Sequence, residues 1–137
     1  MLAFPQELPS DRVSIDRAIT SLNDPARRTS AFAQEGDARA RYAELRASTP
    51  TTGFRILGPV ESARPVVRIS HEPWGEAEIS LPNTRSGIVF IGSDVALSEG
   101  ACVYEVAEGI TRTKPLLFVL RREMGEWKIA SLRVLAP

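Results

Sequence analysis

The chain has 137 residues, of which 43% are hydrophobic and 25% are charged, as in folded globular domains rather than disordered segments. One domain of this length buries roughly 68% of its unfolded surface, so it needs no disulfide or metal to fold. Seventeen basic and seventeen acidic residues give a formal net charge of zero. Without the basic excess that phosphate binding requires, nucleic acid is not an expected partner.

The single cysteine, Cys102, excludes an internal disulfide framework and a thiolate-rich metal site. Residues 1–9 lack the basic start and the apolar stretch of a signal peptide. No apolar run approaches the roughly 18 residues that a membrane span requires. We therefore expect a cytoplasmic chain that contacts no membrane and uses no metal or other cofactor.

Helical patterns fill the first part of the chain. Residues 1–9 are predicted to form an irregular arm, followed by one domain over residues 10–137. A helix is predicted to begin after Pro9, with Ser10 or Asp11 as its N-cap. Four apolar residues then follow the spacing of one helical face: Ile15, Ala18, Ile19 and Leu22.

A second, short helix is predicted to begin with Asp24 as N-cap and Pro25 in its first turn, and to end near Gly36. Its core-facing residues are predicted to be Ala26, Phe32 and Ala33. The next residues, 37–47, are ambiguous. A helix would align Ala38, Tyr42 and Leu45, whereas a strand would align Ala38, Ala40 and Tyr42.

Residues 48–65 are rich in proline, glycine and hydroxyl side chains, which predicts a loop around the short apolar run 54–57. Strands are expected near 66–70 and 77–81. From Ser86 onward four strands follow in sequence: 88–91, 95–106, 116–122 and 127–135. The predicted turns between these four strands are 92–94, 108–114 and 123–126.

The last two strands are apolar on both faces. Strict alternation places Leu116, Phe118 and Leu120 on one face of their strand and Leu117 and Val119 on the other. It also sets Ala130, Leu132 and Val134 opposite Trp127, Ile129, Ser131, Arg133 and Leu135. In an antiparallel sheet with one solvent-exposed face, the sequence of each strand would alternate between apolar and polar residues. We therefore expect both faces to be covered, one by the chain's own helices and one by a second copy of the chain.

Helices first and strands afterwards predict an α+β domain in which a curved antiparallel sheet packs on N-terminal helices. The strand sequences resemble the nuclear transport factor 2-like superfamily, specifically its small SnoaL-like proteins of unassigned function. The matching segments are 88–100, 116–122 and 125–132, with a looser match from Leu22 to Asp24 and from Phe32 to Ala38. Together they cover about half of the chain.

The resemblance implies a cystatin-like cone with a pocket at its open end, and dimers packed sheet to sheet. It also implies that an enzyme on this fold would use an Asp or His in the pocket as general base. Asp37 and His71 are the candidates. Turn or cap chemistry is the alternative for Asp37, and a solvated loop position is the alternative for His71.

Arg133 requires an anionic or polar partner, which would be a carboxylate ligand or an acid at the dimer seam or strand edge. A row of small residues, Ala96, Ser98, Gly100 and Cys102, would either let a helix approach closely or form the floor of a pocket. Trp74 and Tyr104 would line such a pocket, or else belong to the core.

These observations together predict a homodimeric domain that binds a small apolar or carboxylate-bearing molecule, with no assignable catalysis. The alternative is an isomerase, dehydratase or polyketide-cyclase-like enzyme.

Overall fold

The computed structural model describes residues 9–60, 66–71, 75–80 and 87–135, with side chains for 10–60 and 87–135. Within these ranges the chain is α+β, as predicted, with helices before strands. The helices are α1 (Pro9–Thr20), the short 3-10 helix η1 (Ser21–Asn23), α2 (Pro25–Ala31) and α3 (Ala38–Ala47). The strands are β1 (Arg55–Leu57), β2 (Val66–His71), β3 (Gly75–Ser80), β4 (Ile88–Phe90), β5 (Val95–Ala107), β6 (Ile110–Glu123) and β7 (Glu126–Leu135).

The predicted start of the second helix is confirmed, but its predicted end near Gly36 is wrong, because α2 ends at Ala31. The first helix starts earlier than expected: α1 begins at Pro9, so Ser10 and Asp11 lie within its first turn and are not its N-cap. Residues 1–8 of the predicted arm lie outside the described residues.

Asp24 is the N-cap of α2, and its carboxylate accepts a 3.0 Å hydrogen bond from the backbone N–H of Ala26. The apolar stripe predicted for the first helix is buried in full: Ile15, Ala18, Ile19 and Leu22. Ala26 was predicted to face the core but is exposed. It lies five positions before the buried Ala31, which is about 140° around a helix.

The ambiguous segment 37–47 is resolved as α3. Its helical face, Ala38, Tyr42 and Leu45, is buried against α1, α2 and the sheet in one hydrophobic core. Gly36 ends the connection before this helix with φ +129°, and a Cβ on it would lie 2.1 Å from the carbonyl oxygen of Ala130. Glycine is therefore required where this connection passes β7.

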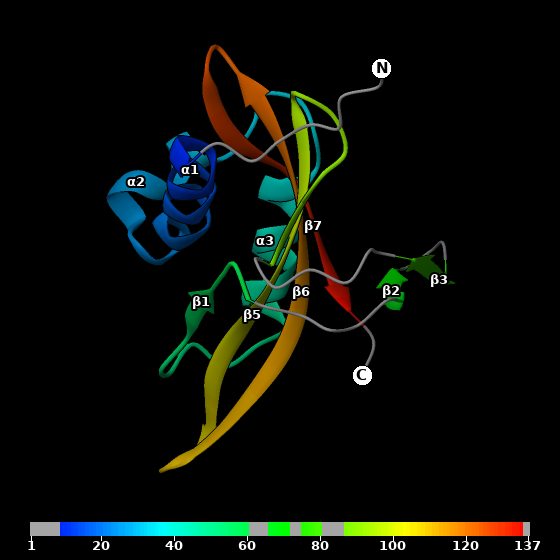
Figure 1. Cartoon of the computed structure of the whole chain (residues 1–137). Helices are drawn as coiled ribbons and strands as arrows, with labels where there is room; N and C mark the ends of the chain where they lie inside the picture. The colour runs from blue at the N-terminus through cyan, green and yellow to red at the C-terminus, as the bar shows by residue number, and fades with distance from the viewer. Residues whose placement is uncertain (1–8, 61–65, 72–74, 81–86, 136–137) are drawn as a thin grey trace.

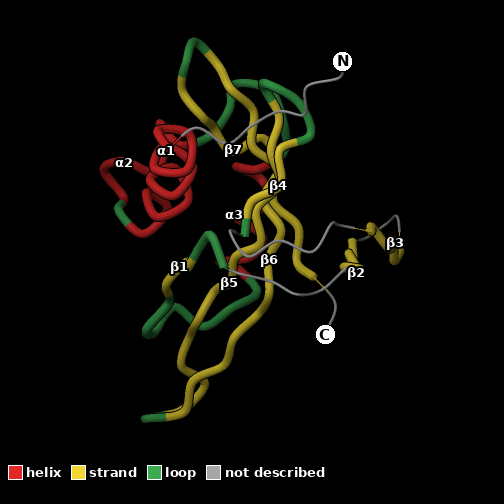
Figure 2. Tube along the Cα trace, in the orientation of Figure 1, coloured by secondary structure: helices red, strands yellow, loops and turns green. Residues whose placement is uncertain are grey.

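The described strands form one antiparallel sheet of order β1-β5-β6-β7-β2-β3, with β4 also paired to β5. β1 and β4 pair with different halves of β5, at Ala101–Val103 and Ala96–Ser98 respectively. Figure 1 views the sheet nearly edge-on, with α1 and α2 to its left. Figure 2 shows in the same orientation that β4, β5, β6 and β7 run side by side next to the helices, with β2 and β3 set off to the right.

The β5–β6 hairpin is longer than predicted. The expected turn 108–114 was wrong, because the strands pair from Ala107 and Ile110 onward and leave a two-residue turn at Glu108 and Gly109. Gly109 has φ +75°, which suits such a tight turn. Residues 110–113 are all exposed although they lie in β6, so the polarity of this segment reflects exposure on both sides of the strand and not a loop.

The closing hairpin is confirmed. Glu123 pairs with Glu126 across a turn whose central residues, Met124 and Gly125, have φ of 51° and 80°. Two consecutive positive φ angles match the twist of adjacent antiparallel strands.

Strict alternation along β7 was wrong, because a β-bulge interrupts it. Val119 pairs with Ser131 but Leu120 pairs with Ile129, so Ala130 is the extra residue. Trp127 and Ile129 therefore share the helix-facing side with Leu132, not with Ser131 and its neighbours. The bulge places Ser131 and Arg133 on the opposite side of the sheet.

Each face of the closing strands contains residues that are buried in the single chain. On the helix side, Phe118, Leu120 and Ile129 are fully buried. On the other side Leu117 is 1% exposed and Leu135 is 2% exposed, outside the helix-side core cluster. The burial of these two residues therefore requires no partner chain.

Candidate functional site

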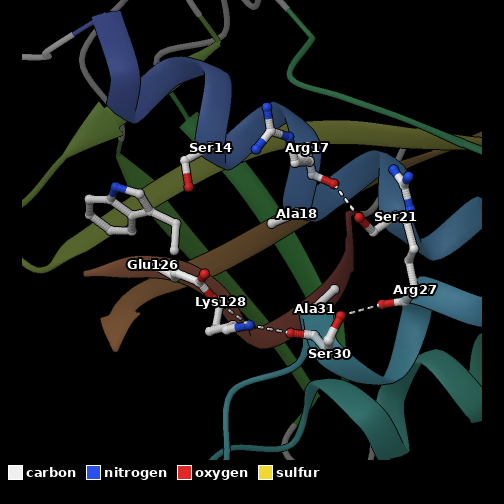
Figure 3. A pocket seen from close by; sticks show the side chains of 10 residues that line it. Ser14, Arg17, Ala18, Ser21, Arg27, Ser30, Ala31, Glu126 and Lys128 are labelled. Carbon is white, nitrogen blue, oxygen red and sulfur yellow. Dashed lines mark hydrogen bonds and ion pairs between the residues drawn. The ribbon is translucent and has the colours of Figure 1, made fainter. Parts of the chain in front are cut away.

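A hollow of about 670 Å³ opens between α1, α2 and the start of β7 (Figure 3). Ten residues line it: Ser14, Arg17, Ala18, Ser21, Arg27, Ser30, Ala31, Glu126, Trp127 and Lys128. Along α1 and into η1 the lining residues have the spacing i, i+3, i+4 and i+7, so one helical face supplies one wall. This largely polar stripe is adjacent to the apolar stripe that packs the core and shares Ala18 with it.

The hollow is electropositive. Three cations and one carboxylate line it, which leaves a formal excess of two positive charges, three minus one. The ammonium of Lys128 is engaged, since it lies 3.1 Å from the Glu126 carboxylate and donates to the backbone oxygen of Ser30. Arg27 forms one long contact, 3.7 Å to the exposed Asp24. The Arg17 guanidinium forms no ion pair or hydrogen bond with the described residues.

Two of the three serine hydroxyls that line the hollow already donate to the protein backbone. Ser21 donates to the backbone oxygen of Arg17 at 2.6 Å, and Ser30 donates to that of Arg27 at 2.8 Å. Both retain acceptor capacity only. Chemically, the arrangement provides two arginines with weak or no protein partners beside small apolar groups, which suits a small anion.

A buried carboxylate fixes the tryptophan at the base of this hollow. Asp11 is 5% exposed and accepts from the Trp127 indole N–H at 3.1 Å and from the Arg122 guanidinium at 3.0 Å. The Arg122 guanidinium also lies 4.8 Å from the centre of the Trp127 ring. The sequence assigned Asp11 to a helix cap and gave no signal for a contact across 116 positions.

Asp37 and Arg133, two of the predicted site residues, are brought together. Arg133 Nη2 donates to Asp37 Oδ2 at 2.7 Å, and Ser131 Oγ donates to Asp37 Oδ1 at 2.8 Å. Although Asp37 is the N-cap of α3, its carboxylate makes no capping hydrogen bond. The anionic partner of Arg133 is therefore an acid of the same chain, at the start of α3.

These contacts set the acidity of Asp37. Burial raises the pKa of the carboxyl, but the hydrogen bonds from Arg133 and Ser131 and the charges of Arg133 and Arg41 outweigh it and lower the pKa to about 2. Such a carboxylate is ionised at neutral pH and is a weak base.

The other predicted site residues lie elsewhere. Tyr104 is partly buried at the margin of the core, with the Lys114 ammonium 5.6 Å from its ring centre. His71 is the last residue of β2 and its side chain is outside the described part of the chain, as is the whole of Trp74. Neither Asp37, Tyr104 nor Arg133 lines the hollow of Figure 3.

The space next to the row of small residues on β5 is occupied by closely packed neighbouring groups. Ala96 and Cys102 are fully buried, and a Cβ on Gly100 would lie 2.5 Å from the Phe118 ring and 2.6 Å from the Leu57 carbonyl oxygen. Burial raises the pKa of the Cys102 thiol, which keeps it protonated and unreactive. The packing of this row favours structural contact over a pocket floor.

Over the described ranges, no group of three or more His, Cys, Asp or Glu side chains is placed to hold a metal ion. No helix in those ranges is both long and apolar enough to cross a membrane. Comparison of the chain with family models, curated proteins and solved structures gives no match.

Proposed function

We propose that this chain is a small-molecule-binding domain of the nuclear transport factor 2-like type, and that the hollow between α1, α2 and β7 binds a molecule bearing a carboxylate. The observation that carries the proposal is the excess of positive charge in an open hollow of about 670 Å³. Ligand sites of this size are lined by apolar groups and a few polar groups that orient the ligand. Here Ala18, Ala31 and Trp127 supply the apolar surface.

Arg17 and Arg27 are the groups that would bind the carboxylate. The contact of Arg27 with Asp24 is exposed on both sides and is worth little, so an anionic ligand competes with it easily. The polar lining favours a carboxylate-bearing ligand over a wholly apolar one. The order of helices and strands supports the resemblance, and the cone with a pocket at its open end stays part of the proposal.

A thermal-shift screen of small carboxylates and their amides tests this function. Carboxylates in excess over their dissociation constants should raise the melting temperature, and the neutral amides should not. The double variant Arg17→Gln/Arg27→Gln should lose the shift, whereas Arg55→Gln, an exposed arginine of β1, should keep it. Equal shifts for acids and amides, or an unchanged shift in the double variant, would contradict the proposal.

We further propose that the domain forms a homodimer through the outer face of its sheet. Three branched apolar residues form a row across adjacent strands on this face, where Val89 pairs with Leu97 and Leu97 pairs with Val119. All three are only half-buried in the single chain. Leu117 and Leu135 on the same face are already buried in the single chain. The dimer would therefore bury only the part of this face that the chain itself leaves exposed.

Sedimentation equilibrium tests the dimer. Val119→Glu should shift the mass toward that of a monomer, since it buries a charge at the seam. Val106→Glu is the matched control, because Val106 is already 47% exposed near the tip of the β5–β6 hairpin. A wild-type chain that stays monomeric at high concentration would rule out the dimer.

The enzyme alternative gains no support from the described residues. Asp37 holds a carboxylate of low pKa whose two oxygens are occupied by Ser131 and Arg133, which is unlike a general base tuned to neutral pH.

A further inference from the structure

A second hollow, of about 460 Å³, lies between α2 and α3 and contains three arginines. We call it the arginine groove. Its lining residues are Arg28, Thr29, Phe32, Arg39, Tyr42, Ala43 and Arg46. It lies on the other side of α2 from the hollow of Figure 3, with no lining residue in common.

The geometry of α3 builds one wall of the arginine groove. Arg39, Tyr42, Ala43 and Arg46 have the spacing i, i+3, i+4 and i+7, so they lie on one face of the helix. Phe32 and Tyr42 form an aromatic floor, with ring centres 6.1 Å apart.

Each guanidinium lies over an aromatic ring. The distances from the guanidinium carbon to the ring centre are 5.7 Å for Arg39 over Phe32, 5.0 Å for Arg28 over Tyr42 and 4.3 Å for Arg46 over Phe54. These cation–π contacts help to position the guanidinium groups. Each guanidinium carries five N–H donors, so donors remain for an acceptor even where one of them already binds the protein.

The groove has no acidic counterpart among the described residues. Two carboxylates near α3 contact Arg41 instead, with Glu44 at 2.9 Å and Asp37 at 3.5 Å. Arg28 and Arg46 donate to neutral acceptors, the Leu22 carbonyl at 2.9 Å and the Tyr42 hydroxyl at 3.1 Å. Three positive charges thus line one hollow in a chain of zero net charge.

Packing accounts for part of this arrangement. Arg28 and Arg46 are half-buried and lie over the rings of Tyr42 and Phe54. Arg39 is exposed, and its charge adds to the repulsion between like charges without an ion pair to offset it. An anion in the groove would relieve that repulsion and accept charge-assisted hydrogen bonds from the guanidinium groups.

We propose that the arginine groove binds a small anion with a flat apolar part, the chemistry of an aryl phosphate. The guanidinium groups bind the anionic group, and the apolar part lies on the aromatic floor. This site is separate from the proposed carboxylate hollow and does not depend on it.

The test uses 1-naphthyl phosphate, 1-naphthol and inorganic phosphate, titrated into the isotope-labelled chain and followed by amide chemical shifts. We expect 1-naphthyl phosphate to bind more tightly than either of the others and to shift the amides of Tyr42 and Ala43. Arg39→Gln should weaken its binding about fivefold, the loss of one exposed charge-assisted contact, and Arg39→Lys should weaken it less.

Arg112→Gln is the matched control, because it also removes an exposed positive charge, but from a residue of β6 that does not line the groove. The melting temperature of each variant checks that it is folded. The proposal is overturned if 1-naphthol binds as tightly as the phosphate, or if Arg39→Gln and Arg112→Gln behave alike. It is also overturned if Arg17→Gln/Arg27→Gln abolishes binding while Arg39→Gln does not, since the probe then occupies the other hollow.

Discussion

Arg133 and Asp37 are 96 positions apart in the chain, yet their side chains meet at 2.7 Å and join the end of β7 to the start of α3. The Asp37 side chain is 35% exposed, so solvent screens part of the attraction. Ser131 donates to the second carboxylate oxygen and fixes the orientation of the carboxylate.

The charge of Asp37 should make stability depend on pH. Its pKa falls from 3.8 to about 2 on folding, so the unfolded chain binds the proton more tightly. The stabilisation is therefore fully present above pH 4 and is lost as the pH falls through about 2. Discounted for exposure, we expect Asp37→Asn to cost about 1 kcal/mol at pH 7 and almost nothing at pH 2. Urea denaturation at both pH values measures it, and an equal cost at each would exclude a role for the charge.

The buried carboxylate of Asp11 should matter more. Asp11→Ala leaves the Trp127 indole N–H without its acceptor and Arg122 without its closest anion. We expect a loss of about 2–3 kcal/mol in the free energy of unfolding. Asp16→Ala, at an exposed position of the same helix, is the control and should change stability by less than about 0.5 kcal/mol. Similar losses in the two variants would show that Asp11 acts only through the helix.

Asn23 ties the short strand β1 to the helices. Its amide oxygen accepts from the Ile56 N–H at 2.7 Å, and its amide nitrogen donates to the Ile56 carbonyl at 2.9 Å. Asn23→Ala should cost about 1–2 kcal/mol and speed hydrogen exchange at the Ile56 amide. Asn23→Asp keeps the acceptor and loses the donor, so the Ile56 amide should remain more protected than in Asn23→Ala. Unchanged exchange in Asn23→Ala would contradict this role.

Gly36 should not tolerate a side chain. Its φ of +129° is strained for other residues, and a Cβ would clash with the backbone of Ala130. We expect Gly36→Ala to cost about 3 kcal/mol, measured by chemical denaturation. Gly92→Ala is the comparison, since a Cβ there meets nothing within 4 Å. A neutral Gly36→Ala would mean that the connection between α2 and α3 shifts freely away from β7.

The elements with local signals were predictable. The stripe that begins at Ile15, the cap at Asp24 and the closing hairpin each depend on residues close together in the sequence. The bulge at Ala130 was not predictable, because strict alternation has no place for an extra residue. Arg133 was expected to need an acid, but nothing in the sequence named Asp37 as that acid.

Each hollow is lined by residues with helical spacing in the sequence, but this spacing has meaning only once the segment is known to be a helix. The spacing of Ser14, Arg17, Ala18 and Ser21 defines a second helical face that runs along α1 into η1, adjacent to the apolar face. The same spacing from Arg39 to Arg46 appears only once residues 38–47 are known to be helical. The net charge of the whole chain gave no sign of either basic cluster, because acidic residues elsewhere in the chain balance the arginines and lysine of the two hollows.

The extra residue in β7, Ala130, changes which face of the sheet the following side chains point to. Before it, Trp127 and Ile129 face the helices, and after it, Ser131 and Arg133 reach the opposite surface while Leu132 returns to the interior. One strand can therefore supply core residues at its hairpin end and a pair of polar side chains for Asp37 at its other end. Without the extra residue, Trp127 and Ile129 would share a face with Ser131 and Arg133, and this strand could not serve both the core and the Asp37 contact.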